Sequence, residues 1–166
     1  MSINKEQLAD LIERVLLDLE EFTLGKIKFT EEAKTLLLMT AAHESHLGKY
    51  IKQVKGPALG IFQMEPATHE DHWAYITPRA WLYDALCAMN LECDTDASAL
   101  EYNLKYAIVM ARVHYYRKPE ALPSSLSKDY IQQLAEYAKK HYNTEEGKAT
   151  PEEYSSDYLK YFVIGY

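Results

Sequence analysis

Apolar residues recur at the spacing of an α-helix along most of this chain, and that pattern limits the possible folds more than any other feature. The first such segment spans residues 4–22, with Leu, Ile and Val on one face and Asp and Glu on the other. Asn4 is a suitable N-cap, and Gly25 follows where the helix should stop. Gly and Pro number only 6 each, too few for a turn-rich all-β chain. We therefore expect a mainly α fold.

A second helix is predicted to begin after Thr30, and its apolar stripe runs on to Glu44 before Gly48 ends it. Residues 48–77 read as irregular, with room for a short strand at 61–63. Later helices are predicted from an N-cap at Thr77-Pro78, from a capping box of Ser98 with Glu101, over residues 128–141, and from Thr150-Pro151-Glu152-Glu153. The total is about six helices in one domain over residues 1–166, without an internal repeat.

Charge and composition exclude several classes of function. The net charge is −7 and no Lys/Arg cluster is visible, which argues against nucleic-acid binding and against an anionic membrane surface. No stretch reaches the roughly 18 apolar residues that a membrane span needs, so we expect no membrane insertion. Cys87 and Cys93 are too few for a disulfide framework, and we interpret them as two small core thiols.

Glu44 is the residue that most clearly points to chemistry. It falls on the apolar stripe in the last turn of the predicted helix, where burial and the negative end of the helix dipole both favour the protonated carboxyl. Glycoside cleavage needs such a group to protonate the leaving oxygen. The alternative reading is a glutamate at a helix end that simply reaches water.

The residues around Glu44 carry a resemblance to a known family. Glu44-Ser45 is followed by Gly60-Ile61-Phe62-Gln63, with Gln63 19 residues after Glu44 and Pro66 nearby. Tyr102-Asn103-Leu104 and Tyr142-Asn143 follow in order. Over residues 30–162 this set resembles the lytic transglycosylases with the lysozyme-like, soluble-lytic-transglycosylase domain. The helix at 4–22 precedes the matched region.

That resemblance implies a lysozyme-like bundle that cleaves peptidoglycan strands without a cofactor. Glu44 would act first as acid and then as base between N-acetylmuramic acid and N-acetylglucosamine, leaving 1,6-anhydro ends. By the same resemblance Ser45 would orient the sugar or the carboxyl group, and Gly60 would let the backbone approach the substrate. Gln63 would hydrogen-bond within the cleft, Tyr142 would hold the Glu44 carboxyl, and Asn143 would fix its loop.

The sequence also departs from the family pattern. His43 and His46 flank the Glu-Ser pair, and Thr144-Glu145 stand where the family has Ala-Gly. Glu65, Glu70 and Asp71 follow Gln63 closely. A second carboxylate roughly 6.5–9.5 Å from Glu44 would permit inverting hydrolysis, so a hydrolytic muramidase is the nearest alternative.

Two readings come from other classes. The pairs His43/His46 and His69/His72 have a spacing that could chelate zinc in a cell-wall peptidase or amidase, although the zincin motif fails at Leu47. A non-catalytic virion module that keeps the fold is the other reading. The 14 tyrosines fit either a half-wet helix surface or a sugar-binding cleft.

The N-terminus shows no apolar run and no small-residue cleavage site, so no secretory signal is predicted. A wall-cutting enzyme of this kind fits a bacteriophage lysin made in the host cytoplasm, or a virion part that works with other phage proteins. Its binding partner would be the glycan strand.

Overall fold

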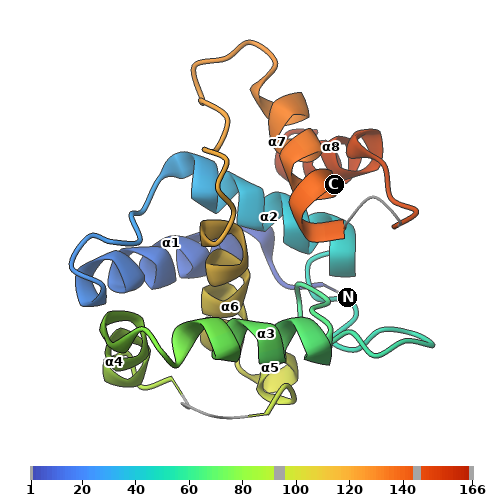
Figure 1. Ribbon diagram of the computed structural model, residues 1–166. Helices are drawn as coiled ribbons and strands as arrows, with labels where there is room; N and C mark the ends of the chain where they lie inside the picture. The colour runs from blue at the N-terminus through green and yellow to red at the C-terminus, as the bar shows by residue number, and fades with distance from the viewer. Residues whose placement is uncertain (1, 92–95, 144–146, 165–166) are drawn as a thin grey trace.

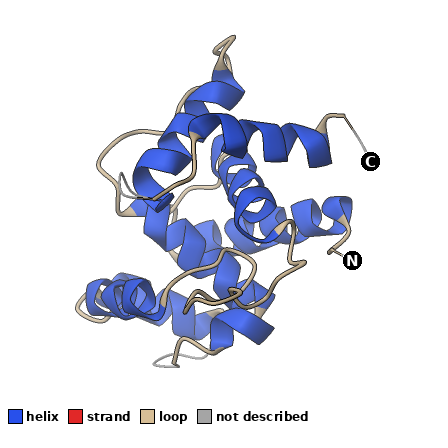
Figure 2. Cartoon of the chain, turned by 90° about the vertical axis from the view of Figure 1, so that its right-hand side faces the viewer, coloured by secondary structure: helices blue, strands red, loops and turns tan. Residues whose placement is uncertain are grey.

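The computed structural model describes residues 2–91, 96–143 and 147–164. Over these residues the chain is mainly helical, as predicted, and it contains no strand (Figure 2). The elements in chain order are α1 (Lys5–Phe22), α2 (Glu31–Ser45), α3 (Pro66–Ile76), α4 (Ala80–Ala88), α5 (Ala99–Tyr102), α6 (Leu104–Tyr116), α7 (Tyr130–Ala138), the π-helical turn η1 (Lys139–Asn143) and α8 (Pro151–Phe162). This part of the chain contains eight α-helices, in keeping with the predicted mainly α bundle of about six.

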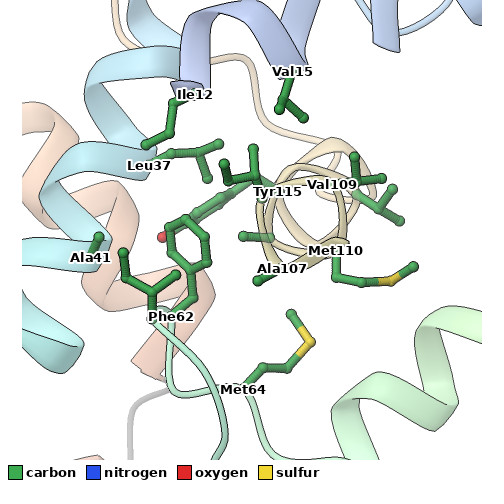
Figure 3. Close-up of a cluster of buried hydrophobic side chains, with 14 of the residues drawn as sticks. Ile12, Val15, Leu37, Ala41, Phe62, Met64, Ala107, Val109, Met110 and Tyr115 are labelled. Carbon is green, nitrogen blue, oxygen red and sulfur yellow. The ribbon is translucent and has the colours of Figure 1, made fainter. Parts of the chain in front are cut away.

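Helix α6 forms the centre of the molecule (Figure 1). Every residue from Tyr106 to Tyr115 is buried, which requires neighbours on all sides of the helix. Helix α1 packs against α6 and α2 through its apolar stripe, and side chains from these helices meet Phe62 and Met64 in one cluster (Figure 3). This core supports the end of α2 that carries Glu44.

Helix α8 covers the other side of α2 and also packs against α7. It begins where the sequence predicts, because the Thr150 side chain and the Glu153 side chain each bond the other residue's backbone N–H in a capping box. Tyr154, in the first turn of α8, is fully buried. The start of the last helix is therefore fixed by local chemistry, and its packing brings a tyrosine beside α2.

Three local predictions are wrong. Residues 66–76 form helix α3, with Pro66 at its first position, and Thr77 caps its C-terminus instead of opening the next helix. The Ser98 side chain makes no capping bond, and the chain breaks at Asn103. The Asn103 side chain accepts the Tyr106 N–H at 3.0 Å and so starts α6 separately.

The segment between α2 and α3 is a series of turns rather than a strand. Its β-type backbone pairing is limited to isolated bridges from Leu59 to Lys52 and to Met64. Residues 61–63 form a turn. Cys87 is part of a disulfide, so the prediction of a free core thiol is wrong for it, and Cys93 lies outside the described residues. Within the described ranges, no helix is long and apolar enough to cross a membrane.

Candidate active site

A pocket of about 400 Å³ opens at the C-terminal end of α2. Five parts of the chain build its wall: the end of α2, the turns that follow, the start of α3, the end of α6 and the turn η1. The lining residues are Glu44, Gln53, Ala58, Gln63, Met64, Glu65, Thr68, His114, Tyr142 and Asn143. Three of the predicted site residues besides Glu44 thus share one pocket with it: Gln63, Tyr142 and Asn143.

Glu44 is half-buried in this pocket, and its Oε1 accepts a hydrogen bond from the Tyr154 hydroxyl at 2.6 Å. Burial raises the pKa of the Glu44 carboxyl above its ordinary value, while the Tyr154 hydrogen bond and His43 act in the opposite direction. Because Oε1 is occupied as an acceptor, the proton of the acid form belongs on Oε2. Glu44 is therefore held in position, and burial favours its protonated form.

A second layer of side chains holds Tyr154 in place. The His43 ring lies 4.0 Å from the Tyr154 ring, and its Nδ1 is 2.9 Å from Oδ2 of Asp157 on the next turn of α8. The contact between His43 and Asp157 joins the C-terminal end of α2 to the middle of α8, directly beside Glu44. His43 therefore does not line the pocket, and it contacts Tyr154 and Asp157 beside it.

Tyr154 was not predicted as a site residue. The sequence does show that Tyr154, Tyr158 and Tyr161 share one face of the last helix, but it does not show which helix that face meets. The bond to Glu44 joins residues 110 positions apart. The prediction that Tyr142 holds the Glu44 carboxyl is wrong. The Tyr142 hydroxyl donates to the Phe62 carbonyl at 2.7 Å, and Tyr154 is the residue that donates to Glu44.

Ser45 does not line the pocket, contrary to the prediction that it orients sugar or carboxyl. It is fully buried, and its Oγ donates to the Ile61 carbonyl at 2.6 Å and accepts the Gly48 N–H at 2.8 Å. Ser45 therefore ties the pocket wall to the end of α2.

Gly60 is buried and does not line the pocket, and its contacts give it a role in the fold. Its φ is +76°, and a Cβ at this position would lie 2.1 Å from the Leu100 carbonyl oxygen. Gln63 lines the pocket as predicted, and its Nε2 donates to the Gly60 carbonyl at 2.8 Å. The amide of Gln63 thus stiffens the turn whose surface it presents to the pocket.

Asn143 lies in the turn η1 and its side chain is held by Lys139, whose Nζ donates to Asn143 Oδ1 at 3.0 Å and to the Gly147 carbonyl at 2.7 Å. These bonds fit the prediction that Asn143 fixes its loop, although it also borders the pocket. Thr144 and Glu145, where the sequence departs from the family, lie outside the described residues.

The three carboxylates considered as a second catalytic group differ in their position relative to the pocket. Glu65 lines the pocket with Glu44 and is exposed at its edge. Asp71 lines a neighbouring pocket and pairs with Arg117 at 2.7 Å, and Glu70 lines neither. Glu65 is therefore the carboxylate to test beside Glu44.

Three of the four histidines of the zinc reading, His43, His69 and His72, contact other partners. His69 is buried and lies 2.5 Å from the Tyr106 hydroxyl, and His72 lies 3.2 Å from His114. The Nδ1 of His46 is buried without a hydrogen-bond partner within the described ranges. Among the residues that the structure describes, no three His, Cys, Asp or Glu side chains gather to hold a metal ion.

His114 reaches the pocket from the end of α6 and was also not predicted there. Its Nε2 lies 2.6 Å from the His141 carbonyl, which can only accept, so this nitrogen carries the proton. Its Nδ1 then accepts from His72 Nε2, and His72 Nδ1 accepts from Arg117 Nη1 at 2.7 Å. Burial is the main reason that the pKa falls to about 3 for His72 and about 4 for His114, so both rings are neutral at pH 7.

Comparison with known proteins adds no assignment. The chain matches no family model, no curated protein and no solved structure.

Proposed function

We propose that this protein cleaves the glycan strands of peptidoglycan between N-acetylmuramic acid and N-acetylglucosamine, with Glu44 as general acid and base. The observation that carries the proposal is the Glu44 carboxyl itself, which is half-buried in a pocket, held by Tyr154, and has a raised pKa. A carboxyl in the acid form near neutral pH is what departure of a sugar oxygen requires. The resemblance of residues 30–162 to lytic transglycosylases supports the same substrate.

The proposed reaction uses one carboxyl twice. Glu44 Oε2 gives its proton to the glycosidic oxygen as the bond from that oxygen to the anomeric carbon breaks. The carbonyl oxygen of the substrate's own N-acetyl group stabilises the positive charge that develops at this carbon. The Glu44 carboxylate then takes the proton of the 6-hydroxyl, whose oxygen bonds to the anomeric carbon and closes the anhydro ring. No water is consumed, and Glu44 returns to its acid form.

The second candidate is hydrolysis of the same bond, and one observation favours it. Glu65 is a second carboxylate on the pocket wall and it is exposed, so it is placed to activate a water. An inverting muramidase needs such a pair of carboxyl groups, one as acid and one as base. The two chemistries share Glu44 and differ in whether Glu65 is needed.

The test is mass spectrometry of the fragments released from purified peptidoglycan by wild type, Glu44→Gln and Glu65→Gln. Anhydro products, lighter by one water than reducing-end products, would support the transglycosylase if Glu44→Gln abolishes them and Glu65→Gln leaves them. Reducing-end products that vanish in both variants would support the muramidase. Glu70→Gln is the matched control, because it makes the same change on the surface outside the pocket. A Glu44→Gln protein with full activity would refute both.

A further inference from the structure

A second pocket, of about 390 Å³, adjoins the candidate active site. Thr68 and His114 line both pockets, so these two side chains form a common wall. The second pocket also contains Arg117 and Lys118, at the C-terminal end of α6, and Asp71 of α3. Two cations therefore lie next to the proposed cleft of a chain whose net charge is −7.

The Arg117 guanidinium is held in a fixed position. Its Nη1 lies 2.7 Å from Asp71 Oδ2 and 2.7 Å from His72 Nδ1, and its carbon lies 4.8 Å from the centre of the Tyr75 ring. Because the hydrogen bonds within the described residues use Nη1, the Nη2 and Nε groups remain available to another acceptor. An arginine held in this way loses little conformational freedom when it binds an anion.

Lys118, unlike Arg117, is not held by an ion pair within the described residues. Its side chain is half-buried. Burial and the neighbouring Arg117 guanidinium lower the pKa of Lys118, so a bound anion would stabilise its charged form. Asp71 acts in the opposite direction on the pKa of Lys118, but its ion pair is with Arg117, so one carboxylate faces two cations in this pocket.

We propose that Lys118 and Arg117 form a carboxylate-binding subsite beside the cleft, which receives an acidic group attached to the glycan strand. This proposal rests on the proposed function for its substrate. In peptidoglycan the carboxylates are those of the peptide on N-acetylmuramic acid, or the lactyl carboxyl itself where the peptide has been removed. Since Thr68 and His114 separate the two pockets, one sugar unit can occupy the cleft while its acidic substituent reaches Lys118. The subsite gives an acidic protein a local attraction for an anionic polymer that its overall charge would repel.

Binding of soluble wall fragments tests the subsite without any cleavage. A disaccharide-peptide with N-acetylglucosamine linked to N-acetylmuramic acid lacks the bond that the enzyme is proposed to cut. Its Kd is measured by calorimetry for wild type, Lys118→Gln and Lys128→Gln, with native fragments and with fragments whose carboxyl groups have been amidated. Lys128→Gln is the matched control, because Lys128 is exposed and lines neither pocket. Lys118 is substituted because its side chain has no hydrogen bond or ion pair to lose within the described residues. Substitution of Arg117 would break its bonds to Asp71 and His72.

We expect Lys118→Gln to weaken binding of the native fragment about fivefold to tenfold, as loss of one charge-assisted contact would. Amidated fragments should bind all three proteins alike and more weakly than native fragments bind wild type. A peptide-free disaccharide distinguishes the two sources, because its carboxylate is the lactyl carboxyl, which the native fragment holds in an amide bond. No effect of Lys118→Gln on this disaccharide would assign the peptide carboxylates, and an equal effect on both ligands would show that the subsite accepts either carboxylate.

Equal binding of native fragments by wild type and Lys118→Gln would overturn the subsite, as would equal binding of native and amidated fragments by wild type. Absence of binding to any fragment would overturn it too. The proposed function is decided separately by release of fragments from whole walls, so wall cleavage by wild type with no charge dependence of binding would refute the subsite alone.

Discussion

Replacement of Gly60 by alanine tests whether this glycine serves the fold or the substrate. Gly60 and Gly25 share a φ of +76°, a conformation that costs an alanine about 1–2 kcal/mol. A Cβ on Gly25 would meet nothing within 4 Å, whereas a Cβ on Gly60 would lie 2.1 Å from the backbone oxygen of Leu100. Gly25→Ala is therefore a matched control for the backbone strain alone.

The Gly60 backbone cannot move aside freely. Its N–H donates to the Ile51 carbonyl at 2.8 Å, and its carbonyl accepts the Gln63 N–H at 3.0 Å and the Gln63 side chain at 2.8 Å. A shift large enough to admit the methyl group would weaken two or three of these bonds, each contributing about 1 kcal/mol. We expect Gly60→Ala to lower the free energy of unfolding by about 3–5 kcal/mol, against about 1–2 kcal/mol for Gly25→Ala.

Thermal unfolding followed by circular dichroism measures both variants. At about 2–4 °C per kcal/mol for a chain of this size, Tm should fall by about 6–20 °C in Gly60→Ala and about 2–8 °C in Gly25→Ala. Equal losses of Tm would refute the reasoning, because the contact with Leu100 would then have no cost. If Gly60→Ala kept its Tm and lost activity on walls, the original prediction of substrate approach would be correct.

Three further predictions concern the carboxyl and its supports. Tyr154→Phe should shift the alkaline limb of the pH–rate profile upward, because loss of the donated hydrogen bond raises the pKa of Glu44 further; an unchanged limb would contradict this. Glu44→Gln should raise Tm at pH 7 but not at pH values below 4.5, the ordinary pKa of the carboxyl. A raised pKa in the folded state lowers stability only where the carboxyl of the unfolded chain is ionised. A gain in Tm that persists at pH 3 would exclude this cause. Ser45→Ala should lower the free energy of unfolding in urea by about 1–3 kcal/mol, because it leaves the Ile61 carbonyl and the Gly48 N–H without a partner; an unchanged denaturation midpoint would show that both find another.

Much of the helical structure could be predicted because its signals are local. The Asn4 and Thr30 caps start α1 and α2 where expected, and the capping box at Thr150 starts α8. Helix α3 was missed because residues 48–77 were predicted to be irregular, although Pro66 stands at the first helical position, where proline is favoured. The break at Asn103 was missed because Ser98 and Glu101 give a capping signal that the Ser98 side chain does not use.

The sequence by itself determined the helical class, the ends of several helices, and the position of Glu44 on an apolar stripe in a last turn. Each of these follows from side chains within a few residues of one another. Only the tertiary structure decided that Tyr154, and not Tyr142, donates to Glu44, that Ser45 and Gly60 are buried outside the pocket, and that Lys118 lines the adjoining pocket. These contacts join distant segments, and they depend on how α2, α6 and α8 pack, which no local pattern specifies.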